Sequence, residues 1–171
     1  QKSASSLKIH FQESFCQYNV IKFILTNILG NRGINVGDDL CSYAFEALFS
    51  LVDENPSLHM LLDCNETSFD ALFASLIAAF SSHKATTHME LVTNWCRLMA
   101  SLLDSCPEYQ IKKPMLSEVC VLVVAIIKSN MMSKSIVKWS CQILHQLSLF
   151  TSPELSVIDK LIQLNSYDLV M

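Results

Sequence analysis

Apolar residues recur along most of the chain at the three- and four-residue spacing of an amphipathic α-helix. Residues 69–80 show this most clearly, with large apolar side chains from Phe69 to Phe80 on one helical face, because 3.6 residues complete a turn. The same spacing predicts helices over residues 19–29 and 116–127. Gly30 is the expected C-cap of the first of these.

Three further stretches align with one another without gaps and predict three more helices. They cover residues 43–51, 95–103 and 139–147. Each begins with an aromatic residue and a small residue, and apolar residues follow four, five and eight places after the aromatic, which places them on one helical face. These shared positions are Tyr43, Ala44, Ala47, Leu48 and Leu51; Trp95, Cys96, Met99, Ala100 and Leu103; and Trp139, Ser140, Ile143, Leu144 and Leu147.

A proline follows each of these three stretches, at Pro56, Pro107 and Pro153. Proline cannot continue a helix interior but is accepted in the first turn of the next helix. Short helical pieces follow the first two prolines, and Val157–Leu164 has the pattern of the start of another unit. The order within a unit is therefore a short helix, a long helix, a linker and a second long helix.

This order resembles the three-helix armadillo repeat and, more loosely, the two-helix HEAT repeat, whose lengths are near 40–47 residues. The resemblance implies an all-α fold, a right-handed α-solenoid of about three to four repeats. It also implies that a helix or extended segment of a partner protein binds along the concave face. We expect residues 1–171 to form a single domain and a fragment of a larger protein. The alternative is an irregular helical bundle.

The composition indicates that much of the surface of the protein is covered by something other than water. Apolar residues make up 51% of the chain and charged residues only 16%, against about 25% charged in an ordinary soluble domain. Neighbouring repeats or a partner would cover such a surface. The longest apolar run, Val119–Ile127, is far shorter than the roughly 20 residues that span a bilayer, so no membrane segment is expected.

The seven cysteines predict reduced, buried thiols and therefore a cytoplasmic or nuclear protein. Their number is odd and they form no Cys-x-x-Cys pair, unlike the disulfide framework of a small secreted domain. The glycosylation sequon Asn65-Glu66-Thr67 points the other way. Thr67 also fits as the N-cap of the following helix.

No residue pattern predicts catalysis, a cofactor or a metal site. The glycines between Gly30 and Gly37 lack the Lys-Ser/Thr of a phosphate-binding loop. His83 and His88 lack the further ligands of a zinc site and are expected in an exposed linker. His59 and Cys64 are expected to be a surface histidine beside a core cysteine. We therefore expect a protein that is not an enzyme.

Charge is distributed unevenly along the chain. Residues 33–83 contain eight acidic residues and no Lys or Arg, whereas residues 112–138 contain five lysines and one glutamate. This asymmetry indicates either solvated helix ends or polarity matched to a partner. The net charge of −4 weighs against nucleic-acid binding, which normally uses a strongly basic face.

The partner-binding residues are predicted from the helix over 116–127, which is hydrophobic on every side and therefore needs cover all round. Burial within the fold itself is the alternative. We expect an interaction scaffold within a larger complex; the alternatives are a structural slice of a longer solenoid and a nucleic-acid-binding helical repeat. The predicted contacts are Ala74, Ile77, Val121, Leu122, Val124, Lys112, Lys113 and Lys128.

Overall fold

The computed structural model describes residues 18–30, 37–82, 88–105 and 113–149, together with Lys8, His10, Phe11, Gln12 and Ser14. The chain is all-helical, with no strand in these ranges. The predicted all-α class is therefore confirmed. The elements are α2 (Val20–Phe23), which continues into a π-helix, η2 (Ile24–Leu29), then α3 (Asp38–Val52), α4 (Leu58–Cys64), α5 (Phe69–Ser82), α6 (Met89–Ser105), α7 (Lys113–Ser129) and α8 (Lys134–Leu149).

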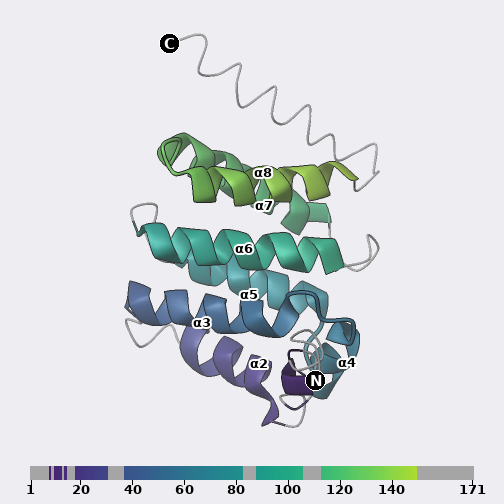
Figure 1. Ribbon diagram of the computed structural model, residues 1–171. Coiled ribbons are helices and arrows are strands. Elements are labelled where there is room, and N and C mark those ends of the chain that lie inside the picture. Colours follow the sequence, from purple (N-terminus) through teal and green to yellow (C-terminus); the bar gives the residue numbers. More distant parts are fainter. Residues whose placement is uncertain are drawn as a thin grey trace, which may run out of the picture.

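The long helices form two rows (Figure 1). In the front row α6 lies between α3 and α8 and contacts both. In the second row α5 contacts η2 on one side and α7 on the other. The rows are joined where α3 packs on η2 and α8 packs on α7. Helices close in sequence thus alternate between the rows, and each row brings together helices that are distant in sequence.

The predicted helices within the described ranges all occur, and the short piece after Pro56 is α4. The short piece after Pro107 and Val157–Leu164 lie outside the described residues. Residues 69–80 lie in α5, residues 116–127 in α7 and residues 19–29 in α2 and η2. The three aromatic-led stretches are the central parts of α3, α6 and α8. Gly30 is the C-cap of η2, and a Cβ atom there would lie 2.6 Å from the carbonyl oxygen of Leu25. Only glycine fits this close approach without a shift of the backbone.

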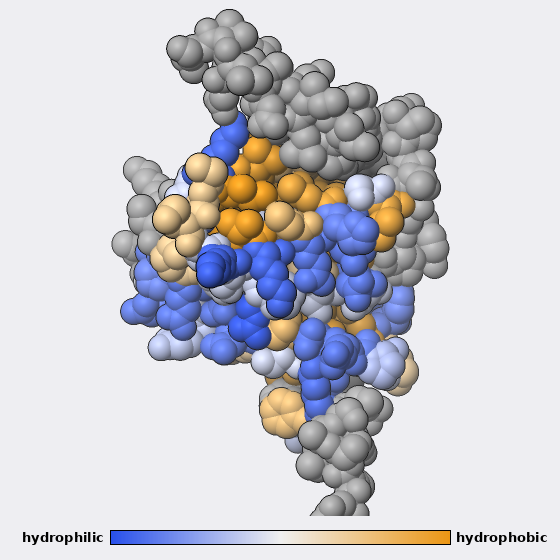
Figure 2. All heavy atoms as spheres, turned by 45° about the horizontal axis from the view of Figure 1, so that its top comes forward, coloured by the Kyte–Doolittle hydropathy of each residue, from blue (hydrophilic) through white to orange (hydrophobic). Residues whose placement is uncertain are grey.

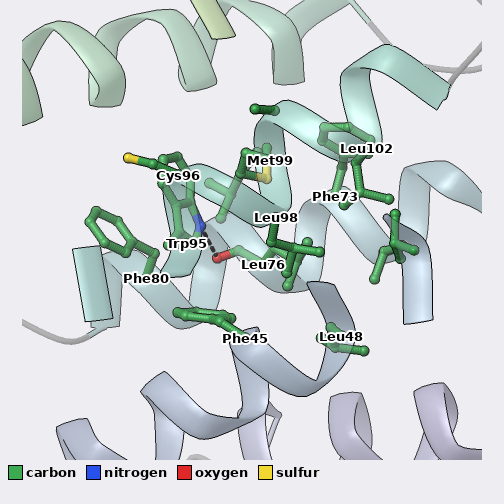
Figure 3. Close-up of a cluster of buried hydrophobic side chains, with 14 of the residues drawn as sticks. Phe45, Leu48, Phe73, Leu76, Phe80, Trp95, Cys96, Leu98, Met99 and Leu102 are labelled. Carbon is green, nitrogen blue, oxygen red and sulfur yellow. Dashed lines mark hydrogen bonds between the residues drawn. The ribbon is translucent and has the colours of Figure 1, made fainter. Parts of the chain in front are cut away.

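The core is centred on Trp95, which is fully buried between the rows (Figure 3). Its indole Nε1 donates a hydrogen bond to the carbonyl oxygen of Leu76, 3.2 Å away. Its ring stacks on that of Phe80 with 4.4 Å between centroids. Phe45 and Leu48 of α3 belong to the same apolar cluster. The polar tip of the indole is thus satisfied inside the core, as a buried tryptophan requires.

The aromatic-led face predicted for α3 is only partly correct. The small residue and the final leucine of all three stretches are buried, but Tyr43 is 60% exposed and Ala47 is exposed too. The reason is the neighbour that α3 faces. Ser42 points at α6 through a hydrogen bond from Asn94, and the next residue along a helix is turned by about 100°. Tyr43 is therefore directed away from α6.

Buried asparagines close several helices. Asn55, Asn65 and Asn130 each donate a side-chain hydrogen bond to the carbonyl oxygen four residues earlier, over 2.8, 2.7 and 3.0 Å. The side chains of Asn55 and Asn130 thereby satisfy carbonyls near a helix end, and that of Asn65 adds to the 3.3 Å bond that its own backbone amide donates to Leu61. Asn65 also accepts a hydrogen bond from the amide of Ile21 over 3.0 Å, which ties α2 to the end of α4.

This geometry rules out the glycosylation reading of the sequon. Asn65 is 0% exposed, and its amide group is engaged on both sides. Thr67 is not the N-cap of α5 either, because its hydroxyl donates to the carbonyl of Asn65. Ser68 holds that place, and its Oγ accepts a hydrogen bond from the amide of Ala71 over 3.1 Å, as an N-cap hydroxyl does.

Candidate partner-binding surface

The outward side of α5 is a strip of small residues. Ala71, Ala74, Ala78 and Ser82 are exposed along it and Ser75 is half-buried. A hollow of about 340 Å³ lies between this strip and the end of η2. Because none of the side chains on the strip is larger than serine, the backbone of α5 is unusually accessible from this side. The hollow is lined by Leu29, Gly30, Ala74, Ser75, Ala78, Ala79 and Ser82.

Small side chains suffice on this strip because large apolar side chains on the opposite side of α5 hold the helix in place. Five large apolar side chains, Phe69, Leu72, Phe73, Leu76 and Phe80, are buried on that side and anchor the helix. The serine hydroxyls on the strip are turned back to their own helix. Ser75 Oγ donates to the carbonyl of Ala71 and Ser82 Oγ to that of Ala79, each over 2.8 Å. The strip therefore presents few polar groups that would need hydrogen bonds from an apolar ligand.

Helix α7 contacts α5 and carries most of the other predicted contacts. Val121 is 46% exposed and Leu122 is half-buried against the core. Helix α7 is thus not buried on every side, because Val121 and Ala125 are both exposed. Val124 and Ile77 are only 8% and 3% exposed, so these two predicted contacts belong to the core and cannot form a partner surface.

The predicted basic contacts are described only in part. Lys128 is exposed in the last turn of α7, where a positive charge favours the helix dipole. Lys113 begins α7, but its side chain lies outside the described residues, as does the whole of Lys112. Of the eight predicted contacts, Ala74, Val121, Leu122 and Lys128 therefore lie at the described surface on α5 and α7.

Lysines from the N-terminal part of the chain neutralise some of the acidic stretch. Lys8 Nζ lies 2.7 Å from Asp53 Oδ2 and 3.4 Å from Glu54 Oε2, and the hydrogen bond to Asp53 raises the pKa of Lys8. Lys22 pairs with Glu66, and its hydrogen bond lowers the pKa of that carboxyl. This part of the charge asymmetry is therefore matched within the chain.

The cysteines and histidines show no chemical centre in the described ranges. Burial raises the pKa of the Cys41 and Cys96 thiols to about 12, which makes both poor nucleophiles. No group of three His, Cys, Asp or Glu side chains that could hold a metal ion occurs in the described part of the chain. Cys64 and Cys141 are exposed, so the prediction of buried thiols is wrong for these two.

The histidines are placed differently from one another. His88 is half-buried at the start of α6, where Nδ1 accepts a hydrogen bond from the Leu91 amide over 3.3 Å. Its Nε2 lies 3.2 Å from Asp39 Oδ1, so His88 caps the helix and is not a loop histidine; His83 lies outside the described residues. His59 is exposed and packs edge-on against Phe69 with 5.3 Å between ring centroids. Both histidines have structural contacts that the sequence did not predict.

The described helices and the comparisons with known proteins point to no membrane span and no family. Among the described helices, none has the length and apolar character needed to cross a bilayer. No protein family, curated protein or solved structure matches the chain. The function therefore has to be argued from the surfaces of the chain itself.

Proposed function

We propose that this chain is part of a right-handed α-solenoid of armadillo- or HEAT-like repeats that binds a segment of another protein. The observation that carries the proposal is that matching positions of the aromatic-led helices meet in space. Ser42 and Asn94, each just before the leading aromatic, are joined by a hydrogen bond of 3.0 Å. Cys96 and Ser140, each just after it, lie 3.7 Å apart.

This matching supports a stack of repeats over an irregular bundle. In a bundle of unrelated helices, positions aligned by sequence have no reason to be neighbours. In a stack, each unit is displaced from the one before by a small constant rotation, so equivalent side chains come together at every interface. The alternation of the helices between two rows has the same explanation, with α3, α6 and α8 as the second long helix of successive units (Figure 1).

The hollow over α5 is the proposed binding surface. A helix or extended peptide would approach closely where Ala74 and Ala78 form the floor, with Leu29 as an apolar wall. Recognition of an apolar helix face by a groove of this kind is a recurrent mode of peptide binding.

Two exposed alanines provide a matched test. Ala74 lies in the hollow, whereas Ala47 is exposed on α3 in the front row. A photo-reactive phenylalanine analogue at Ala78 of the whole chain should cross-link to one discrete protein in a cell extract. The substitution Ala74→Arg should abolish that product, and Ala47→Arg should leave it unchanged, with the same helical circular dichroism in both variants.

The other outcomes separate the alternatives. Loss of the product in both variants, or in neither, would contradict binding in the hollow. A cross-linked product made only of nucleic acid, with a gel shift that disappears at high salt, would favour a nucleic-acid-binding repeat. No product at any salt concentration would favour a purely structural slice of a solenoid.

A further inference from the structure

The turn between α7 and α8 exposes two large apolar side chains. Met131 is 72% exposed and Met132 is 96% exposed, the two highest values among the exposed large apolar residues in the described part of the chain. The turn lies at one edge of the α7–α8 end (Figure 1). It contributes no residue to the hollow over α5, so the proposed peptide-binding surface does not account for it.

The backbone of this turn holds the two methionines outward. The amide of Ser133 donates a hydrogen bond to the carbonyl oxygen of Asn130 over 2.9 Å, which makes Met131 and Met132 the central residues of a four-residue turn. Asn130 is 7% exposed, and its side chain donates to the carbonyl of Ile126 over 3.0 Å. Glycine, proline and short polar residues dominate such turns, so two adjacent methionines there are unusual.

The charges around this turn are all positive. Residues 119–149 contain three lysines and no aspartate or glutamate. Lys128 is exposed in the last turn of α7, and Lys134 and Lys138 are exposed in the first two turns of α8. The start of α8 carries the positive end of the helix dipole, where an acidic residue would be favourable, yet Lys134 stands there. Lys134 therefore does not stabilise α8, and together with the dipole it attracts anions.

An apolar tip beside exposed lysines matches the surface of an anionic lipid bilayer. Apolar side chains enter the boundary between headgroups and acyl chains, while lysines contact the negative headgroups. Figure 2, in which this end of the molecule is turned forward, shows apolar residues bordered by hydrophilic ones. A side chain as exposed as Met132 enters lipid without a matching pocket, whereas a protein partner would have to enclose it in a preformed one.

Acidic residues elsewhere limit the contact to this corner of the molecule. The helices of the front row, α3, α6 and α8, begin on the same side (Figure 1). Unlike α8, α6 has the exposed Glu90 in its first turn, and α3 has the exposed Asp38 and Asp39. An anionic surface repels these carboxylates. The protein would therefore approach a bilayer with the α7–α8 turn first.

We propose that the α7–α8 turn binds the surface of membranes rich in anionic lipid. Met131 and Met132 insert into the acyl boundary, and Lys134 and Lys138 contact the headgroup phosphates. This contact is peripheral, because the turn enters only one leaflet. With two inserted side chains and a few lysines, binding is reversible. The inference goes beyond the proposed scaffold function and does not depend on the hollow over α5.

The test measures sedimentation of the whole chain with vesicles. One set is made of phosphatidylcholine alone, and the other contains about 30% phosphatidylserine, to give the surface a negative potential. We expect binding mainly to the second set. Met132→Ser should weaken it about fivefold, while Met60→Ser, at a methionine that is 64% exposed on α4, should leave it unchanged. Lys134→Gln should weaken it about fivefold as well. Circular dichroism checks that each variant keeps its helices.

Several results would overturn the proposal. The wild type could ignore both sets of vesicles, or bind both equally well. Met132→Ser and Met60→Ser could reduce binding by the same factor, which would mean that the turn is not the site of contact. A photo-reactive phenylalanine analogue at position 132 provides an independent readout in a cell lysate that contains membranes. A lipid adduct supports the proposal, and a protein adduct without a lipid adduct would assign the turn to a protein partner.

Discussion

Helices α6 and α8 follow one sequence pattern but are buried to very different extents. Ten of the seventeen residues of α6 are buried, among them Trp95, whereas four of the sixteen in α8 are. Trp139, the counterpart of Trp95, is half-buried, and Lys138 lies over its ring at 4.8 Å from the centroid. The sequence pattern therefore determines which side of a helix is apolar. The number of neighbouring helices determines how much of that side is buried.

The two interfaces of α6 also differ in their polar contacts. Toward α3, Asn94 bonds to Ser42 in a buried position, and the guanidinium of Arg97 lies 4.2 Å from the ring centroid of Phe49. Toward α8, the hydrogen bond from Gln146 to Asp104 is exposed, and the buried contact is the long one of 3.7 Å between Cys96 Sγ and Ser140 Oγ, where the thiol is only a weak hydrogen-bonding group. Buried polar pairs are costly to break because the remaining partner stays without water. The α3–α6 interface should therefore be the more sensitive of the two.

The two tryptophans give the largest expected contrast. Trp95→Ala removes the stacking on Phe80 and leaves the Leu76 carbonyl without its indole donor, at a cost of about 3–5 kcal/mol in the free energy of unfolding. Trp139→Ala loses a half-buried ring and a cation–π contact, at a cost of about 1–1.5 kcal/mol. Urea unfolding followed by circular dichroism measures both. Equal losses would show that α8 is sealed as fully as α6.

The next contrast concerns the polar pairs of α6. Asn94→Ala leaves the buried Ser42 hydroxyl without its partner and should cost about 1–3 kcal/mol. Gln146→Ala breaks an exposed hydrogen bond and should cost about 0.5 kcal/mol or less. A double-mutant cycle of Asn94→Ala and Ser42→Ala should show coupling of about 0.5 kcal/mol or more. Additive losses would mean that the two side chains do not act as a pair.

The buried thiol of Cys96 in α6 should make the stability of the protein depend on pH. Burial raises the pKa of this thiol from 9.0 to about 12, so the folded state favours the protonated form. Its contribution to stability is complete below pH 9 and is lost as the pH rises from 9 to 12. Over that window the free energy of unfolding should fall by about 1.4 kcal/mol per pH unit from this group.

The substitution Cys96→Val should remove that part of the slope. Ser140→Ala keeps the thiol but removes its polar neighbour, and it should keep the slope. Urea unfolding at intervals from pH 8 to 11 measures both variants. An unchanged slope in Cys96→Val would show that other groups cause the alkaline loss.

The smallest expected effect concerns only the rate at which exposed and buried cysteines react with an alkylating reagent. Iodoacetamide on the folded protein at pH 8 should modify Cys64 and Cys141, which are exposed, and spare Cys41, Cys96 and Cys120, which are buried. Peptide mass spectrometry locates the adducts, and denatured protein serves as the positive control. Rapid modification of Cys96 in the folded protein would indicate that the α6–α8 interface opens readily.

The helices could be predicted from the sequence because their evidence is local. Large apolar side chains at a spacing of 3.6 residues, such as Phe73 and Leu76 in α5, bury one side of a helix in almost any fold. The same local rule identified Gly30 as a helix end. It could not predict the π-turn of η2, which no residue pattern specifies.

The candidate surface was harder to predict because exposure depends on neighbouring helices. Ala74 and Val121 are exposed and Ile77 and Val124 are buried, although periodicity alone treats all four as apolar helix positions. The polar contacts of Asn65 and His88 join residues far apart or at helix ends, and they too need the packed structure. One signal was available, since alanines and serines recur on one side of α5 opposite the aromatic residues.

The strip of alanines and serines on α5 has an entropic consequence. A long side chain such as lysine or methionine loses up to about 2 kcal/mol of rotamer freedom when a contact immobilises it, while alanine loses none. A partner that settles on Ala71, Ala74 and Ala78 would therefore find a surface already in its final conformation. Most of the ordering on association would fall on the incoming chain, so its own stiffness would largely set how tightly it is held.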